Sequence, residues 1–281
     1  MDKIKQAIIA NIEVHSVMAD EYNKIEPHFR PESIKRVDRI ISNINLKRKI
    51  DKVLDLGCGT GFMINIVKKY ASEITGVDVT QAMMDKVDLT GKAKIDLINS
   101  DTGTVNLPEN YYDLATAYTF LDHLYDMTPT FKNAFKSLKN GGIFYADLSP
   151  NHYFWKNIKS LDLNNKYHSV VQREINAVLN KDAEIEQQFG IDKQTFKAAE
   201  FQKHLKGGLV EEELKEILLK VGFKKVDFIY HWFIGQAQII NDDKTDVEIR
   251  FKNANLINEL LTNVLPLSRN LFKYVGFIAE K

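Results

Sequence analysis

The residues best suited to hold a ligand lie in the glycine-rich run 53–62, VLDLGCGTGF. Apolar residues lead to Asp55, and Gly57, Gly59 and Gly61 then recur at every second position before a helix-like stretch. Glycine readily adopts positive φ, so the backbone N–H groups of such a turn can approach a ligand closely at a helix start. In the dinucleotide fingerprint G-x-G-x-x-G the third glycine comes five positions after the first, whereas Gly61 comes four positions after Gly57. The spacing therefore argues against NAD.

Two further acidic residues stand at the ends of predicted strands later in the chain. Asp78 closes the run 74–78, 23 residues after Asp55, and Asp101 closes the run 98–101. A carboxylate offers two acceptors to the two hydroxyl donors of a ribose diol, so we expect Asp78 to bind a ribose. Either aspartate alone would more often be a surface residue or a helix cap, and the joint order of the motifs carries the argument.

The glycine turn, Asp78, Asp101 and the strand-like run 112–116 occur in an order that resembles the class I S-adenosylmethionine (SAM)-dependent methyltransferases of the small-molecule type. The resemblance covers residues 34–147 and, more weakly, 208–281. It implies a Rossmann-like α/β fold: an open, mostly parallel seven-stranded sheet with helices on both faces and an antiparallel last strand. It also implies SAM as the cofactor and methyl transfer as the activity.

SAM carries a carboxylate, an ammonium and a sulfonium but no phosphate. Backbone N–H groups near Gly59 and Gly61 suit the carboxylate, and Asp55 suits the ammonium, directly or through a water. In the family, a carboxylate at the place of Asp101 takes the adenine amine, and the next backbone N–H meets a ring nitrogen. Val79, Met83 and Met84 are placed to flank the adenine, with core packing as the alternative for the methionines. The expected cofactor-binding residues are Tyr22, Asp55, Gly57, Cys58, Gly59, Gly61, Asp78, Val79, Met83, Asp101, Thr102 and Tyr118.

Histidines just past the predicted strand ends are candidates for removing a proton from the methyl acceptor, because histidine titrates near neutral pH. His123 is the first choice: the segment 120–124 resembles the family's segment after strand four, where a histidine commonly lies near the transferring methyl. The alternative is that His123 only orders its loop. The expected acceptor-binding residues are His152, Tyr153, Trp155 and His231, and the aromatic cluster 152–155 has the alternative of anchoring an insertion to the core.

Short apolar runs alternate with helical patterns, which is typical of βαβ units and a parallel sheet. We expect strands at 52–55, 73–78, 94–98, 113–117 and 142–147, helices at 61–70, 81–87 and 128–138, and a turn at 139–142. Residues 151–205 are compatible with helices or antiparallel strands. A helix at 211–221 and strands at 226–230 and 274–279 enclose an irregular stretch, 232–268. We expect a single domain over 1–281, with an N-terminal helical cover (1–30), a SAM-binding core (31–150), an inserted cap after strand five (151–208) and a closing part (209–281).

Composition describes an ordinary water-soluble protein. The chain has 281 residues, 44% of them hydrophobic and 27% charged, with a formal net charge of zero that gives no support to nucleic-acid or membrane binding. Cys58 is the only cysteine, and no apolar run approaches the length of a membrane span. We expect a cytoplasmic enzyme, monomer or homodimer, that acts on a small molecule and holds no metal. The alternatives are a non-catalytic SAM sensor or scaffold, a nucleic-acid methyltransferase and, against the glycine spacing, a nicotinamide oxidoreductase.

Overall fold

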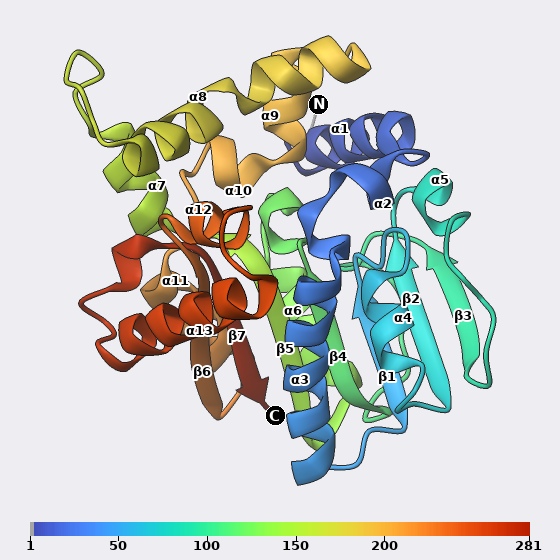
Figure 1. The fold of residues 1–281 in the computed structure, drawn as a ribbon. Helices are drawn as coiled ribbons and strands as arrows, with labels where there is room; N and C mark the ends of the chain where they lie inside the picture. The colour runs from blue at the N-terminus through green and yellow to red at the C-terminus, as the bar shows by residue number, and fades with distance from the viewer. Residues whose placement is uncertain (1–2) are drawn as a thin grey trace.

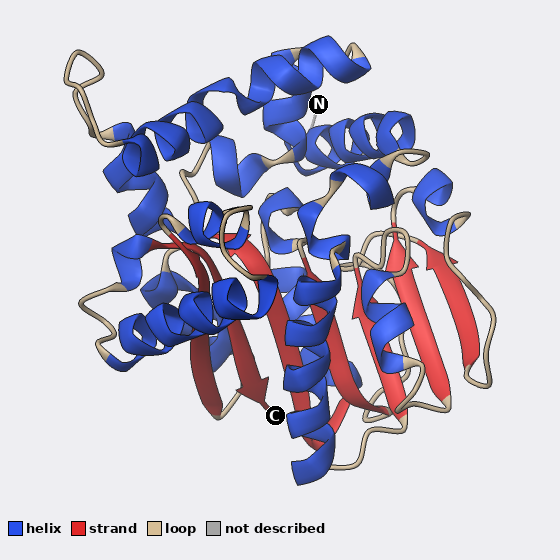
Figure 2. Ribbon diagram, in the orientation of Figure 1, coloured by secondary structure: helices blue, strands red, loops and turns tan. Residues whose placement is uncertain are grey.

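Seven strands form one sheet at the centre of the molecule (Figure 2). The computed structural model describes residues 3–281, and of residues 181 and 182 only the backbone. The strands are β1 (Lys52–Leu56), β2 (Glu73–Asp78), β3 (Lys94–Asn99), β4 (Tyr112–Tyr118), β5 (Leu138–Pro150), β6 (Lys225–Phe233) and β7 (Phe272–Glu280). Their order is β3-β2-β1-β4-β5-β7-β6, and β7 runs antiparallel to β5 and β6 while the other neighbours are parallel. The predicted Rossmann-like sheet with an antiparallel last strand is confirmed.

Helices cover both faces of this sheet and the edge at which its parallel strands end (Figure 1). The α-helices are α1 (Lys3–Met18), α2 (Tyr22–Ile25), α3 (Pro31–Lys47), α4 (Phe62–Val67), α5 (Gln81–Met84), α6 (Thr128–Ser137), α7 (His152–Lys159), α8 (Ser169–Phe189), α9 (Lys193–Ala199), α10 (Phe201–His204), α11 (Glu211–Val221), α12 (Gln236–Ile240) and α13 (Val247–Asn263). Three short 3-10 helices are η1 (Pro27–Phe29), η2 (Leu121–His123) and η3 (Arg269–Leu271).

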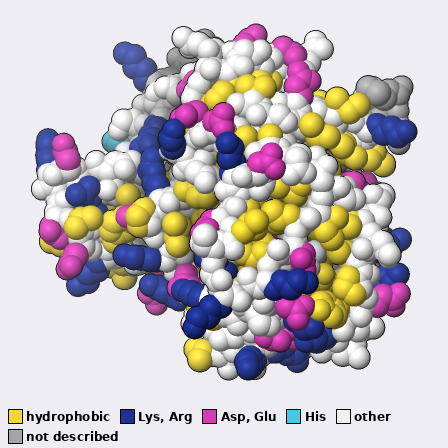
Figure 3. All heavy atoms as spheres, turned by 90° about the vertical axis from the view of Figure 1, so that its right-hand side faces the viewer, with side chains coloured by type: hydrophobic (Ala, Val, Ile, Leu, Met, Phe, Trp, Pro, Cys, Tyr) yellow, Lys and Arg dark blue, Asp and Glu magenta, His cyan; other side chains and the backbone are white. Residues whose placement is uncertain are grey.

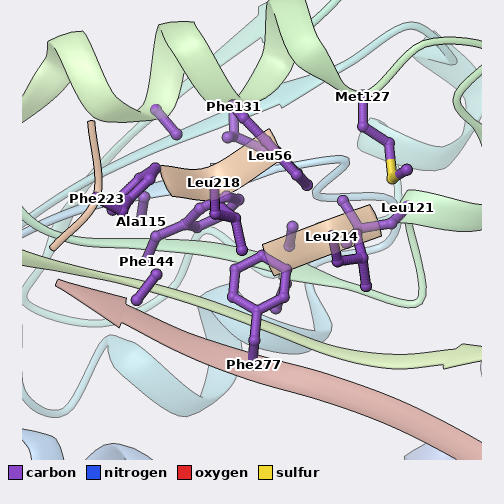
Figure 4. Close-up of a cluster of buried hydrophobic side chains, with 14 of the residues drawn as sticks. Leu56, Ala115, Leu121, Met127, Phe131, Phe144, Leu214, Leu218, Phe223 and Phe277 are labelled. Carbon is purple, nitrogen blue, oxygen red and sulfur yellow. The ribbon is translucent and has the colours of Figure 1, made fainter. Parts of the chain in front are cut away.

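The central strands are buried on both faces, as parallel strands between helix layers must be. In β1, Val53 packs with α3 and α4 on one face, whereas Leu54 and Leu56 pack with α6 and α11 on the other. Figure 4 shows the second cluster, in which Phe131 of α6 and Leu218 of α11 lie against side chains from the strands. Packing on two sides fixes the carboxyl ends of β1, β2 and β4, where the candidate site lies.

A cap of helices lies over that edge. Its helices come from the N-terminal segment (α1) and from the segment that follows β5 (α8 and α9). Helix α1 packs against α9, and the buried side chains of Val14, Met18, Ile185 and Phe196 join α1, α8 and α9 in one cluster. Figure 1 shows α1 beside α9 above the carboxyl ends of the strands. The sequence left helices and antiparallel strands both open for residues 151–205. The regular elements of this segment are all helices, α7 to α10.

Three local expectations were wrong. The helix expected at 81–87 ends at Met84, because Asp85 closes it and an irregular loop follows. The turn expected at 139–142 lies within β5, where Gly141 takes a φ of +71°. The stretch 232–268 holds α12 and α13. Helix α13 packs against α12 and β6, and it lies on the same face of the sheet as α3 (Figure 1).

Candidate functional site

The glycine turn after β1 is tied to β2 by its own backbone. The N–H groups of Gly57 and Cys58 both donate to the Val77 carbonyl, at 2.8 and 3.1 Å. Gly57, Gly59 and Gly61 all have positive φ, between +50° and +88°. A Cβ on Gly57 would lie only 2.1 Å from the Phe120 ring, so both backbone conformation and close approach require glycine there. The turn therefore presents bare backbone at the sheet's edge.

Asp78, at the end of β2, is held in one orientation by the turn that it faces. Its Oδ2 accepts the Gly59 N–H and its Oδ1 accepts the Thr80 N–H, each at 2.8 Å. Burial raises the pKa of Asp78, although these two hydrogen bonds oppose the shift. Each oxygen keeps a lone pair, so the carboxylate can still accept two hydroxyl donors. A ribose diol matches that capacity.

Asp55 is the buried charge in this region that lacks compensation. Its Oδ1 accepts the Thr116 hydroxyl at 2.6 Å, while its Oδ2 has no hydrogen-bond partner among the described residues. Burial raises the pKa of Asp55 to about 7, and the nearby negative charge of Asp78 adds to the shift. An orphaned buried carboxylate oxygen fits a cationic partner such as the ammonium group of SAM.

A cavity of about 780 Å³, counting the space open to solvent, lies between the glycine turn, the end of β4 and the N-terminal helices. It brings together most of the residues predicted from sequence: Tyr22, Gly57, Cys58, Gly59, Asp78, Val79, Met83, Asp101, Thr102, Tyr118 and His123. Asp55 and Gly61 are not among its lining residues. We call it the cofactor cavity.

Asp101 and Thr102 lie in the loop that follows β3. Oδ1 of Asp101 accepts the Gly103 N–H at 3.0 Å, and its second oxygen has no hydrogen-bond donor among the described residues. Thr102 is buried and its hydroxyl pairs with that of Thr130 at 2.8 Å. These bonds fix the loop backbone beside the cofactor cavity, which Asp101 and Thr102 both line.

An aromatic wall closes the cofactor cavity on the N-terminal side. Tyr118 stacks on Phe62 with the ring centroids 4.5 Å apart, and His28 meets the Tyr118 ring edge-on at 5.7 Å. Tyr22 and Phe29 extend the wall. The cavity is also lined by Phe29, Phe62, and Ile8, Asn11 and His15 of α1, which the sequence analysis did not single out. His28, Phe29 and the residues of α1 lie in the N-terminal segment that was expected to cover the cofactor, and Phe62 ends the glycine-rich run.

His123, in η2, is anchored to the cap. Its Nδ1 lies 2.9 Å from the Ala199 carbonyl oxygen, and its ring meets His15 edge-on at 4.8 Å. Asn11 donates to the His123 carbonyl at 3.3 Å. Because a carbonyl oxygen can only accept, Nδ1 donates to Ala199, and Nε2 is the nitrogen left to accept a proton. The placement is compatible with either expected role, proton acceptor or ordering of the loop.

The aromatic cluster after β5 lies away from the cofactor cavity. Nδ1 of His152 is 3.1 Å from the Gly207 carbonyl oxygen. Tyr153 hydrogen-bonds Glu212, and the Arg269 guanidinium lies 3.7 Å from the centre of its ring. Trp155 is buried in the cluster that joins α7 to α8. None of the three aromatic residues lines a cavity described here, and their contacts are those of an anchor for the cap.

His231, by contrast, lines a second cavity, which lies between α3, α8, α12 and α13 and has about 3150 Å³ of empty space including open solvent. The two cavities share two lining residues, His28 and Tyr118. Arg36 spans the junction: it donates to Asp147 Oδ2 at 2.8 Å and to the Tyr118 hydroxyl at 3.4 Å. The second cavity therefore begins where the aromatic wall of the cofactor cavity ends.

No group of three histidine, cysteine or acidic side chains close enough to hold a metal ion occurs in the part of the chain that the structure describes. Over the same residues, no helix is long and apolar enough to cross a membrane.

A sequence model of the methyltransferase domain family matches residues 54–146, the stretch that contains the glycine turn, Asp78 and Asp101. Together with the sheet order and the glycine turn, this match assigns residues 54–146 to the class I SAM-dependent methyltransferase domains. The ubiquinone biosynthesis O-methyltransferase of Pseudomonas fluorescens is 26% identical over 160 residues, which cover 54% of this chain and 66% of that protein. The enzyme of that name from Coxiella burnetii is 28% identical over 120 residues, 41% of this chain and 50% of that one. The chain spans between 44% and 66% of the length of these curated relatives.

Solved structures share the fold. A SAM-dependent methyltransferase from Archaeoglobus fulgidus is similar with a TM-score of 0.51 at 20% identity, over 89% of this chain and 95% of that one. A Haemonchus contortus phosphoethanolamine N-methyltransferase, solved with phosphomonomethylethanolamine and S-adenosylhomocysteine, gives a TM-score of 0.57 at 13% identity. That match covers 100% of this chain and 60% of the other. At these identities the similarity concerns the fold alone.

Proposed function

We propose that this methyltransferase moves the methyl group of SAM to an oxygen or nitrogen of a small-molecule acceptor. The observation that carries the proposal is the cofactor cavity, where the glycine turn and two oriented carboxylates meet an aromatic wall that a second cavity shares. A cap of helices over this edge favours a small acceptor over a polymer that needs an open groove. The named O-methyltransferases among the relatives agree with an oxygen acceptor.

In this proposal three carboxylates bind the cofactor's polar groups. Asp78 binds the ribose hydroxyls with the oxygens that the turn orients. Asp101 takes the adenine amine through its second oxygen, beside the backbone of Thr102. Asp55, which does not line the cavity, compensates the ammonium directly or through a water, with the oxygen that has no partner among the described residues. A charge-assisted hydrogen bond of this kind is worth roughly 1.5–3 kcal/mol.

The remaining proposed contacts are apolar or come from the backbone. Val79 and Met83 flank the adenine, and the Gly59 and Gly61 region receives the carboxylate at the start of α4. Tyr22 and Tyr118 cover the methionine end together with the backbone of Gly57 and Cys58. These contacts suit a nucleoside that carries an amino acid and a sulfonium, and they do not suit a dinucleotide that carries phosphates. Among the residues that the structure describes, no lysine or arginine lines the cofactor cavity.

When bound, SAM supplies an electrophilic methyl: the bond to sulfur breaks with its electrons left on sulfur, an acceptor lone pair forms the new bond, and the acceptor loses a proton. The chain's own part is to position the two reactants, exclude water and take up that proton. We propose His123 for the last task, because its Nδ1 is engaged by the Ala199 carbonyl and its Nε2 remains an acceptor. The cap that holds His123 also shields the reacting atoms from water.

Transfer of a labelled methyl group tests the proposal. The purified chain is incubated with methyl-labelled SAM and a low-molecular-weight extract of the source cells, and in parallel with DNA and with RNA. We expect label in a small product and none in nucleic acid. Tight binding of S-adenosylhomocysteine without labelled product in any fraction would instead indicate a sensor, and label in nucleic acid would contradict the small-molecule assignment.

A further inference from the structure

The second cavity carries more unpaired positive than negative charge. Its lining includes five cations with no hydrogen-bond or ion-pair partner among the residues that the structure describes: Arg30, Lys35, Arg39, Arg173 and Lys252. Three lining acids, Glu32, Glu248 and Glu259, are also without such a partner. Two more cations, Arg36 and Lys273, are paired with Asp147 and Glu174. The excess cations are therefore available to a ligand.

The positions of these cations follow from helix geometry. Residues four apart share a helix face, so Lys35 and Arg39 of α3 lie next to each other beside the cavity, with Arg36 between them in sequence. Arg30 precedes the first turn of α3, and Arg173 comes from α8 across the cavity. Three of the five unpaired cations are arginines, whose planar guanidinium binds carboxylate and phosphate groups through two parallel hydrogen bonds.

A second, independent observation is the state of His231 at the cavity's inner end. The side chain is 91% buried, and neither ring nitrogen makes a hydrogen bond in the described structure. Asp147 Oδ1 lies 3.3 Å from its Nδ1 but without hydrogen-bonding geometry. Burial and the charge of Arg36 lower the pKa of His231 to about 3, so the ring is neutral. A buried neutral imidazole without partners costs free energy that a polar ligand can recover.

Residues with positive φ also line the second cavity. Leu148 and Trp232 have φ values of +61° and +63°, which branched or bulky residues rarely adopt, and both line the second cavity. Thr119, with a φ of +49°, lines the cofactor cavity. Thr119 directly follows β4, and Leu148 and Trp232 lie within the last three residues of β5 and β6, so all three are at the same edge of the sheet. Strain of this kind persists where the surroundings impose it, and it clusters at binding sites.

We propose that the second cavity is the acceptor site, and that the acceptor carries a carboxylate or phosphate group bound by Arg30, Arg39 and Arg173. The inference rests on the proposed function, because it assigns the acceptor of that same reaction. His231 hydrogen-bonds the acceptor at the inner end. The reacting oxygen or nitrogen reaches the cofactor cavity at the junction formed by His28 and Tyr118, the two residues that line both cavities.

Ligand binding tests this without any turnover. Trp232 lines the second cavity and reports on it by fluorescence. Phenyl phosphate and benzoate should quench the emission of the S-adenosylhomocysteine-saturated protein, and benzyl alcohol should bind more than about tenfold more weakly. The variant Arg39→Gln should lose at least about tenfold in affinity for the anions, the equivalent of one charge-assisted hydrogen bond. Lys215→Gln, an unpaired surface lysine of α11, is the matched control, and Trp232→Phe should remove the signal.

Equal binding of benzyl alcohol and the anions, no binding of either anion, or an Arg39→Gln variant indistinguishable from Lys215→Gln would overturn the inference. The labelled product separates this failure from failure of the proposed function. A product that anion-exchange resin retains supports an acidic acceptor, and its release by phosphatase identifies phosphate as the group. A labelled product that passes through the resin leaves methyl transfer standing and refutes the anionic acceptor. No labelled product at all counts against the proposed function itself.

Discussion

Asp55 provides the sharpest test of how the cofactor's ammonium is bound. Its carboxyl is buried, one oxygen lacks a partner, and its pKa is raised to about 7. If the ligand's ammonium pairs with the carboxylate, binding must favour the ionised form and lower that pKa. With a pKa of about 7, about one tenth of the free protein is ionised at pH 6 and about nine tenths at pH 8. Affinity for SAM and S-adenosylhomocysteine should therefore rise about tenfold between these two pH values.

The variant Asp55→Asn keeps an oxygen for the Thr116 hydroxyl and removes the titration. Its dissociation constant, measured by calorimetry, should be nearly flat from pH 6 to pH 8. At pH 8 it should bind about tenfold or more weakly than the wild type, since one charge-assisted hydrogen bond is lost. Any titration of the ligand itself appears equally in both proteins. A wild type whose affinity does not change with pH, or a variant with the same slope, would refute the ion pair.

The same carboxyl makes a prediction about stability without ligand. Because its pKa is raised on folding from 3.8 to about 7, the folded chain holds a proton that the unfolded chain has lost, and stability falls as pH rises through that window. A shift of this size corresponds to about 4 kcal/mol as an upper bound. Asp55→Asn should therefore unfold at a higher denaturant concentration than the wild type at pH 8, with the difference vanishing near pH 4. An equally or less stable variant at pH 8 would contradict the buried, uncompensated charge.

Three further outcomes are expected. The purified chain should bind SAM and S-adenosylhomocysteine by calorimetry but neither NAD nor NADP, and binding of a nicotinamide nucleotide would count against the interpretation of the glycine spacing. Asp78→Ala should weaken SAM binding by more than about tenfold, and by more than Asp101→Ala does, because Asp78 is assigned two hydrogen bonds to the ligand and Asp101 one; the reverse order would exchange their roles. His123→Ala should lower turnover of a hydroxyl acceptor by roughly 10²–10⁴ while SAM affinity stays within a few-fold, and unchanged turnover would leave His123 with only a positioning role.

The sheet and the cofactor cavity could be predicted because their signals are local in sequence. Most strands are short, largely apolar runs that end in a turn or an acidic residue; Asp78 ends β2, and Asp101 follows β3 by two residues. The packing of β1 between two helix layers leaves its apolar run almost uninterrupted, which is the pattern that a buried parallel strand requires. Motif order alone then determined which carboxylates meet at one edge.

The cap and the second cavity could not be predicted, because their contacts join distant segments. Arg36, Asp147 and His231 become neighbours only through the sheet order and the placement of α3. The face that α1 turns to the cap is also not evident from its sequence: Ala10, Val14 and Met18 pack with residues of α8 and α9, whereas Ile4 and Ile12 are exposed. Figure 3, which turns the right-hand side of Figure 1 to the viewer, shows hydrophobic side chains exposed on this face.

A crystal structure with S-adenosylhomocysteine bound would test the central claim most directly. We expect the ribose hydroxyls within hydrogen-bonding distance of the Asp78 carboxylate, the adenine between Val79 and Met83, and the sulfur at the junction of the two cavities, beside His28 and Tyr118. The sulfur lone pair that carries the methyl group in SAM should face the second cavity. A ligand bound elsewhere, or a sulfur that faces away from the second cavity, would contradict the assignment of cofactor and acceptor to these two neighbouring sites.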